Sequence, residues 1–172
     1  LLEKYEGFKS INGTAENSTL PNSSVNLIIC AQAFHWFDIP KAKAEFKRIL
    51  KSGGRICLMW NERKLNATPF LTAYEELLNK FGTDYRSVRH ENIDDNKLAE
   101  FFDKSYKVKT FQNKQVFDHE GVKGRLLSSS YAPLPGEPGY EAMMQELKEI
   151  FDKFSKNGVI EFLYDTNIYY NN

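Results

Sequence analysis

Two apolar runs joined by a polar segment with helical features constrain the fold of this chain most strongly. The runs are Val25–Cys30 and Ile56–Trp60, and between them Asp38 and Pro40 are residues typical of a helix start. The order strand, helix, strand predicts a crossover connection, which places two parallel strands side by side. Sheets of this kind bind ligands beyond the carboxyl ends of their strands. The segment Ala31–Asp38 is therefore the first place to expect a functional site.

The rest of the chain alternates between helical and strand-like patterns. Apolar residues at helical spacing predict helices over Thr68–Phe81 and Tyr140–Phe154, and alternating residues predict a final strand over Val159–Tyr170. We also expect a short strand at Phe8–Ile11 and one or two strands within Lys107–Phe117. Candidates for the buried face of the latter are Val108, Phe111 and Val116.

The apolar run Val25–Cys30 is expected to be a strand covered on both faces, so its residues should belong to the core. On that expectation, the substitution Ile29→Ala should cost roughly 2–5 kcal/mol, because it removes buried methyl groups and leaves a cavity. The predicted core consists of Leu27, Ile28, Ile29, Phe46, Ile49, Ile56, Leu58, Leu147, Phe151 and Phe162.

The composition narrows the class of protein. A chain of 172 residues is predicted to form one domain over 1–172. Lys and Arg total 23, as do Asp and Glu, and this balance argues against a nucleic-acid partner. No apolar run reaches the roughly 18 residues of a membrane span, and the first residues lack signal-peptide features, so we expect no membrane and a cytoplasmic location. Cys30 and Cys57 are expected to be reduced core thiols, although neighbouring strands would also allow them to pair.

Two segments carry a family resemblance. Ala31–Asp38 (AQAFHWFD) and Arg48–Arg55 (RILKSGGR) resemble class I S-adenosylmethionine-dependent methyltransferases of type 11, in the branch that includes ubiquinone-biosynthesis and trans-aconitate methyltransferases. The resemblance extends from about Phe8 to Tyr169. It implies an α/β, partial Rossmann-like fold with a mostly parallel sheet, an antiparallel last strand and helices on both faces. It also implies substrate-covering helices around 61–104 and 119–157.

The resemblance implies a site for S-adenosylmethionine made of two segments. Thr14, Ala15 and Glu16 match the positions that face the adenine, where a side-chain acceptor and a backbone N–H would meet the ring. The strand-end residues Ala31, Gln32 and Ala33 match the positions beside the methionine part, where small side chains let the backbone approach a ligand.

The same resemblance implies a small-molecule substrate and no metal. His35 is the candidate catalytic base, since a histidine pKa suits neutral pH, although a histidine that only shapes the pocket is the alternative. Trp36, Arg125 and Tyr131 are candidate substrate contacts, with packing or solvent exposure as their structural alternatives. Substrate choice is expected to lie with Trp60–Tyr85 and with Leu127–Tyr131.

The resemblance begins after the family's first strand, Gly-rich turn and second strand, so we expect an N-terminally incomplete methyltransferase domain. Removing those strands would bare one edge of Val25–Cys30, which contains no proline and no charge. We expect Phe8–Ile11 to pair with this edge; a strand from a second chain, giving a homodimer, is one alternative.

A second hypothesis is a non-catalytic, methyltransferase-like remnant that serves as a binding or dimerisation module. Another doubly wound enzyme is disfavoured, because the chain holds no G-x-G-x-x-G sequence.

Overall fold

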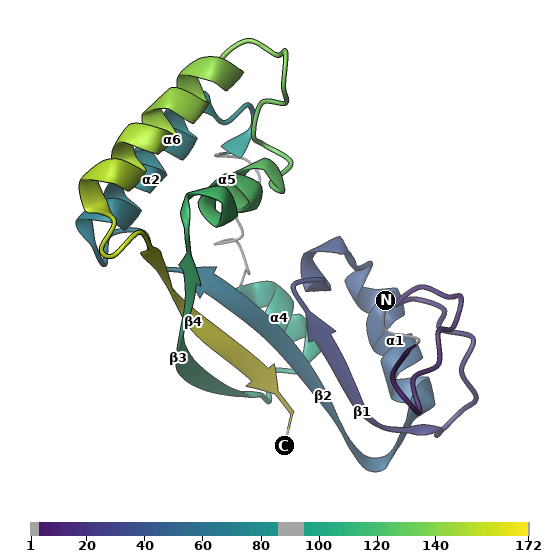
Figure 1. Ribbon diagram of the computed structural model, residues 1–172. Coiled ribbons are helices and arrows are strands. Elements are labelled where there is room, and N and C mark those ends of the chain that lie inside the picture. Colours follow the sequence, from purple (N-terminus) through teal and green to yellow (C-terminus); the bar gives the residue numbers. More distant parts are fainter. Residues whose placement is uncertain (1–3, 86–94, 172) are drawn as a thin grey trace. The chain divides into compact units, whose positions relative to one another are not determined.

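The computed structural model describes residues 4–85 and 95–171, and the chain divides into two compact units, each built from separate stretches of sequence (Figure 1). Unit 1 comprises Leu1–Trp60, Ile93–Thr110 and Asn167–Asn172. Unit 2 comprises Asn61–Asn92 and Phe111–Thr166. The expectation of a single domain over 1–172 stays a prediction, and the two units are treated separately below.

The described strands form one four-stranded sheet. Its order is β1 (Val25–Ala31), β2 (Leu50–Arg63), β4 (Ile160–Tyr170) and β3 (Lys107–Phe117). β1 and β2 are parallel, with Ile28 opposite Ile56 and Cys30 opposite Leu58, as the crossover pattern predicts. In unit 1, Asn171 N–H donates to Ile56 O (3.4 Å), and in unit 2, Lys64 N–H donates to Leu163 O (2.8 Å). The residue numbers in these pairs run in opposite directions, so β2 and β4 are antiparallel.

The predicted mostly parallel sheet is therefore wrong for the described residues, which form a mixed sheet. The predicted strand at Phe8–Ile11 is absent, and both of these residues are exposed. The chain that follows is bonded to helix α1 (Ile39–Ile49), because Glu45 Oε1 accepts hydrogen bonds from the backbone N–H and the hydroxyl of Ser18. These contacts hold the loop against the helix, and β2 is the one strand in the described sheet that pairs with β1.

Unit 1 has an aromatic core between its strands and two helices. Asp38 caps α1 by accepting from Lys41 N–H (3.3 Å), as its position before the helix predicts. Helix α4 (Asp95–Phe101) packs against α1. Phe34 lies edge-on to Phe101, with ring centroids 4.9 Å apart. The buried residues of this core are Cys30, Phe34, Phe46, Ile56, Leu58, Trp60, Leu98, Phe101 and Phe102.

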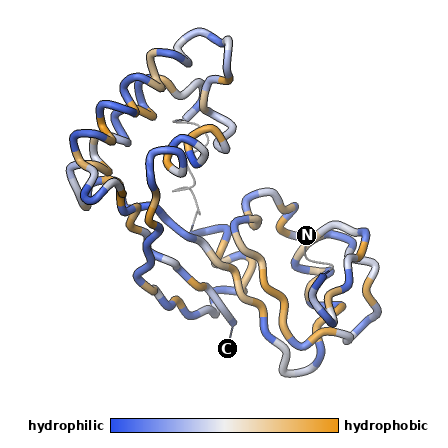
Figure 2. Tube along the Cα trace, viewed as in Figure 1, coloured by the Kyte–Doolittle hydropathy of each residue, from blue (hydrophilic) through white to orange (hydrophobic). Residues whose placement is uncertain are grey.

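One face of β1 is bare, contrary to the expectation that helices cover both faces. Leu27 and Ile29 are 52% and 57% exposed, whereas Cys30 is buried and Ile28 is partly buried. Alternate residues of a strand point to opposite faces, so the helices of unit 1 cover the face that carries Ile28 and Cys30. Figure 2 shows β1 as a strongly hydrophobic stretch. The prediction that Leu27 and Ile29 belong to the core is wrong for the described chain.

Unit 2 is built around three helices: α2 (Pro69–Phe81), α5 (His119–Leu127) and α6 (Tyr140–Phe154). α6 packs against both α2 and α5. Thr68 caps α2 by accepting from Leu71 N–H (3.2 Å). The fully buried core includes Leu71, Tyr74, Leu77, Val122, Leu126, Leu147 and Phe162. The prediction that Val108, Phe111 and Val116 form a buried face of β3 is wrong, because all three are exposed.

Candidate functional site

The carboxyl end of β1 presents backbone and small side chains. The N–H of Gln32 donates to Met59 O (2.9 Å), which ties the end of β1 to β2. Gln32 has φ +54°, a left-handed conformation that turns the chain sharply out of the strand. Ala33 then begins the short 3-10 helix η2 (Phe34–Trp36), which places Phe34 in the core. The local sequence thus ends the strand at residues too small to block a ligand.

The loop that contains Thr14 and Glu16 is fastened to the start of helix α1. Glu16 Oε1 accepts a hydrogen bond from the backbone N–H of Asp38 (3.0 Å), and this bond is the largest cause that lowers the pKa of Glu16. Glu45, which is 8% exposed, also receives two hydrogen bonds from Arg48, each 2.7 Å. The hydrogen bonds from Arg48, and then from Ser18, lower the pKa of Glu45 to about 2.

A hollow of about 560 Å³ lies between this loop, β1 and α1, entirely within unit 1. Four of the six predicted cofactor residues line it: Thr14, Ala15, Ala31 and Ala33. Glu16 and Gln32 are not among its lining residues; the former instead holds the loop to α1, and the latter shapes the strand end. The apolar part of the lining includes Leu20, Ile28, Cys30, Phe37, Phe46 and Ile49.

The hydroxyl of Thr14 is already used as an acceptor. Its Oγ1 receives hydrogen bonds from Glu16 N–H (3.2 Å) and Asn17 N–H (3.1 Å), which occupy both of its lone pairs. The predicted role of Thr14, accepting the adenine amino proton, does not suit this geometry. The Thr14 side chain also hydrogen-bonds to the Glu16 carboxylate and helps to lower the pKa of Glu16. The N–H of Ala15 makes no hydrogen bond to any residue that the structure describes.

His35 and Trp36 lie on the exposed side of η2. Trp36 is 80% exposed, and its ring centroid is 4.8 Å from that of His35. This exposure excludes the alternative that Trp36 packs in the core, and its role as a substrate contact stays a prediction. Phe34 takes the core position of the segment instead, at 2% exposure.

Arg125 and Tyr131, the other two candidate substrate contacts, belong to unit 2. Arg125 is half-buried; its Nε donates to the Tyr164 hydroxyl (3.0 Å), and its guanidinium lies 4.8 Å from the centre of the Phe162 ring. Tyr131 packs against Tyr85 with ring centroids 4.9 Å apart. These two contact candidates therefore lie in a tyrosine-rich region of unit 2.

Sequence reasoning missed a buried ionic cluster in the same unit. Arg63 Nη2 bonds to Glu75 Oε2 (2.6 Å), and the Tyr85 hydroxyl donates to the same carboxylate oxygen (2.6 Å). Burial raises the pKa of Tyr85, and its hydrogen bond to Glu75 acts in the same direction. Tyr74, which lies on the apolar face of its helix, is fully buried, and its hydroxyl has no hydrogen-bond partner among the residues that the structure describes. The available signal in the sequence was Glu75, a charged residue that directly follows Tyr74.

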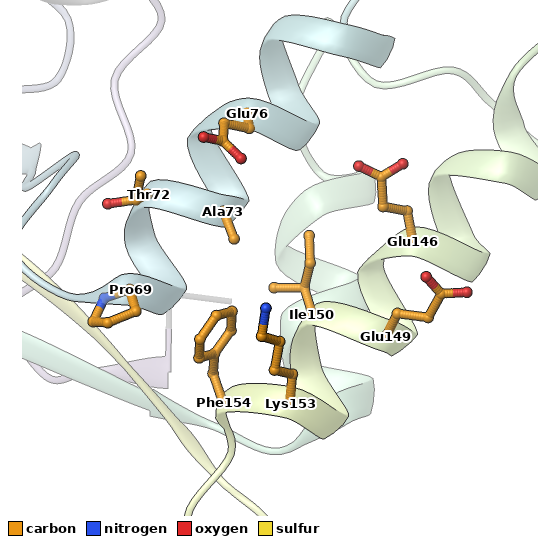
Figure 3. A pocket seen from close by; sticks show the side chains of 9 residues that line it. All are labelled: Pro69, Thr72, Ala73, Glu76, Glu146, Glu149, Ile150, Lys153 and Phe154. Carbon is orange, nitrogen blue, oxygen red and sulfur yellow. The ribbon is translucent and has the colours of Figure 1, made fainter.

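A second hollow, of about 460 Å³, lies between α2 and α6 (Figure 3). Its lining carries Glu76, Glu146, Glu149 and Lys153, and Glu146 also pairs with Lys80 (2.6 Å). None of the residues that sequence analysis proposed for binding or catalysis lines it. Over 4–85 and 95–171, no group of three His, Cys, Asp or Glu side chains is placed to hold a metal ion.

The described thiols are free, and no described helix has both the length and the apolarity needed to cross a bilayer. Cys30 lines the hollow beside β1, and burial, followed by its neighbour Cys57, raises its pKa to about 11. Burial also raises the pKa of Cys57. These shifts oppose formation of the reactive thiolate at neutral pH.

The segment that holds this site is similar to known methyltransferases. The family described as "Methyltransferase domain" matches residues 2–58, which contain the strand β1 and the hollow beside it. An uncharacterized methyltransferase-like protein of Schizosaccharomyces pombe is 33% identical over 84 residues, which cover 49% of this chain and 32% of the relative. An uncharacterized methyltransferase of Mycobacterium tuberculosis is 47% identical over 51 residues, or 30% of this chain and 21% of the relative. The match to the fission-yeast relative thus spans about a third of its length.

Solved structures agree on the fold. The "putative type II methyltransferase" of Anaeromyxobacter dehalogenans superposes with a TM-score of 0.63 at 15% identity, over 92% of this chain and 69% of the other. A "putative methyltransferase" of an antibiotic-biosynthesis pathway in Anabaena variabilis gives a TM-score of 0.55 at 18% identity, over 93% and 71%. Residues 2–58 thus match the methyltransferase domain family, and the chain is similar to methyltransferases in sequence over that part and in fold over most of its length.

Proposed function

We propose that this chain is part of an S-adenosylmethionine-dependent methyltransferase that acts on a small molecule. One observation carries the proposal: four residues that the family resemblance assigns to the cofactor line a single hollow that runs along the parallel strand β1 to its carboxyl end. Sheets of this type bind their ligands at the carboxyl ends of their strands. The family match over residues 2–58 covers the same segment and supports the proposal.

The lining of the hollow suits the two ends of the proposed cofactor. At one end, the N–H of Ala15, which makes no hydrogen bond within the described residues, can donate to a nitrogen of an adenine ring, and Leu20 offers an apolar surface. At the other end, Ala31 and Ala33 leave the backbone open to close approach by the methionine part. The 172 residues do not include the Gly-rich turn of the family, so these residues supply only part of the binding contacts.

The proposed methyl transfer requires little general acid–base catalysis by the protein. When bound, S-adenosylmethionine supplies a methyl group already activated by a positive sulfur. The protein then needs to align the acceptor and exclude water. His35 is exposed on η2 and is the candidate to take a proton from the acceptor. The ring of Trp36 lies beside it and offers a contact surface for the substrate.

Calorimetric titration of the chain with S-adenosylhomocysteine tests the proposal. Ala31→Phe fills the hollow and should weaken binding at least about tenfold, which corresponds to roughly 1.4 kcal/mol. Ala44→Phe adds the same side chain at a position of α1 outside the hollow and should change the affinity less than about twofold. Equal binding by both variants, or no binding by the unmodified chain, would contradict the proposal.

The bare face of β1 favours one alternative, a binding or dimerisation module. Leu27 and Ile29 expose apolar surface on a strand that pairs on one side only, and such edges readily accept another strand. Sedimentation analysis over a range of concentrations tests this alternative. A dimer that Ile29→Lys dissociates, in a chain that binds no S-adenosylhomocysteine, would favour the module over the enzyme.

A further inference from the structure

Three buried side-chain polar atoms in unit 2 have no hydrogen-bond partner among the described residues: the Tyr74 hydroxyl, Arg63 Nη1 and His119 Nε2. The first two belong to side chains that contact each other; Tyr74 is fully buried and the Arg63 side chain is 10% exposed. Burying a donor without a partner costs free energy, and native structures rarely leave one in that state. The Tyr74 hydroxyl and Arg63 Nη1 can therefore donate to an acceptor from outside the described chain.

The two donors belong to one cluster. The Arg63 guanidinium lies 5.3 Å from the centre of the Tyr74 ring, and the Tyr74 ring packs edge-on against Phe162 at 5.0 Å. Arg125 lies over Phe162 at 4.8 Å, so both guanidinium groups flank the same pair of aromatic rings. Burial raises the pKa of Tyr74 to about 12, which keeps its hydroxyl protonated and able to donate.

The cluster carries more positive than negative charge. Arg63 is matched by Glu75 at 2.6 Å. Arg125 forms no ion pair with any residue in the described part of the chain; its Nε donates to the neutral hydroxyl of Tyr164. A half-buried guanidinium without a carboxylate leaves an excess of one positive charge beside the two unpaired donors.

We propose that Arg125, the Tyr74 hydroxyl and Nη1 of Arg63 bind an oxyanion, a carboxylate or a phosphate, within unit 2. Guanidinium groups bind both oxyanions through charge-assisted hydrogen bonds, and the phenol supplies a further donor. Because Arg125 is partly exposed, the anion can reach it from solvent.

Nuclear magnetic resonance of the arginine Nε–H groups tests the proposal, at constant ionic strength and with three probes. Succinate represents carboxylates, inorganic phosphate represents phosphates, and succinamide is the neutral match for succinate. We expect succinate or phosphate to shift the Arg125 Nε–H signal in a saturable way, and the tighter of the two identifies the oxyanion. Succinamide should leave the signal unchanged. An equal response to succinamide, or no response to either anion, would overturn the proposal.

Three variants separate a site from a charged surface. Arg125→Gln should weaken binding of the anion at least about tenfold. Lys123→Gln removes one positive charge from the same helix and should change the affinity less than about twofold. Tyr74→Phe keeps the fold, because it deletes only an unpaired buried hydroxyl, and should weaken binding about fivefold without lowering the unfolding temperature.

The variants and the cofactor titration give separate answers. If Lys123→Gln weakens the anion as much as Arg125→Gln does, or if Tyr74→Phe leaves its affinity unchanged, the anion site is wrong. Binding of S-adenosylhomocysteine by the unmodified chain is measured in its own titration. Anion binding without cofactor binding would contradict the methyltransferase proposal alone, and the reverse result would contradict the anion site alone.

Discussion

The two units of this chain depart from ordinary packing in different ways. Unit 1 leaves apolar side chains uncovered, with Leu27 and Ile29 more than half exposed on β1. Unit 2 buries three side-chain polar atoms that have no hydrogen-bond partner among the described residues, the Tyr74 hydroxyl, Arg63 Nη1 and His119 Nε2, whereas unit 1 has one, Trp60 Nε1. An exposed apolar strand lacks a packing partner, and a buried free donor lacks an acceptor. The comparison teaches what kind of partner each unit lacks. The bare face of β1 in unit 1 needs an apolar surface, and the unpaired donors of Tyr74 and Arg63 in unit 2 need an acceptor such as an anion.

The largest expected effect tests the exposed strand against its buried neighbour. Leu58→Ala removes a fully buried side chain from β2 and should cost about 2–5 kcal/mol in unfolding free energy. Ile29→Ala, on the bare face of β1, should cost less than about 1 kcal/mol, because little buried surface is lost. Urea unfolding followed by circular dichroism measures both values.

The same pair of variants can break the comparison. If Ile29→Ala costs as much as Leu58→Ala, the face that carries Leu27 and Ile29 is covered in solution. Repeating the measurement at several protein concentrations would then identify the cover, since only a second copy of the chain makes the cost depend on concentration.

The helices and the last strand could be predicted because their signals are local. Tyr140–Phe154 begins and ends where the apolar spacing indicates, and Thr68 caps its helix as its residue type suggests. The cover of β1 could not be predicted in this way. Val25–Cys30 is apolar on both faces, and an apolar face does not tell which segment will lie on it. Contacts from Ser18 to Glu45, 27 positions later, decided where the preceding chain would go.

The residues of the candidate sites also divide into those that the sequence indicated and those that only the fold brings together. The family resemblance brought Thr14, Ala15, Ala31 and Ala33 to attention, and they line one hollow. The sequence indicated Arg125 as a substrate contact but not its place beside Tyr74 and Arg63, because the three residues come from α5, α2 and β2 and carry no common motif. Tyr74 also satisfies the apolar spacing of its helix, which predicts packing and no other role. Only the fold places it beside two arginines.

A smaller effect is expected from Glu45, which holds the loop containing Ser18 against α1. Glu45→Gln removes the charge that binds Arg48 and Ser18, and should lower the urea midpoint at pH 7. The pKa of Glu45 is lowered from 4.5 to about 2, so its stabilising contribution is present above pH 4.5 and is lost as the pH falls toward 2. The difference between the unmodified chain and Glu45→Gln should therefore shrink over that range.

Asp152→Asn is the matched control, because Asp152 forms an exposed pair with Lys148 on α6. Exposed pairs contribute little to stability, so this variant should follow the unmodified chain at every pH. A constant difference between the unmodified chain and Glu45→Gln from pH 7 to pH 2 would show that the carboxylate charge does not hold the loop.

The smallest expected effect concerns the two tryptophans of unit 1, which differ in solvent exposure. Trp36 is 80% exposed and Trp60 is 1% exposed. Trp36→Phe should change the unfolding free energy by no more than about 0.5 kcal/mol, because no buried contact is lost. The remaining emission, from Trp60, should shift to shorter wavelength and resist quenching by acrylamide. In Trp60→Phe, the emission should come from a water-exposed ring and be quenched readily. If instead Trp36 resists the quencher in that variant, the exposed side of η2 is covered in solution, and the contrast between Trp36 and Trp60 fails.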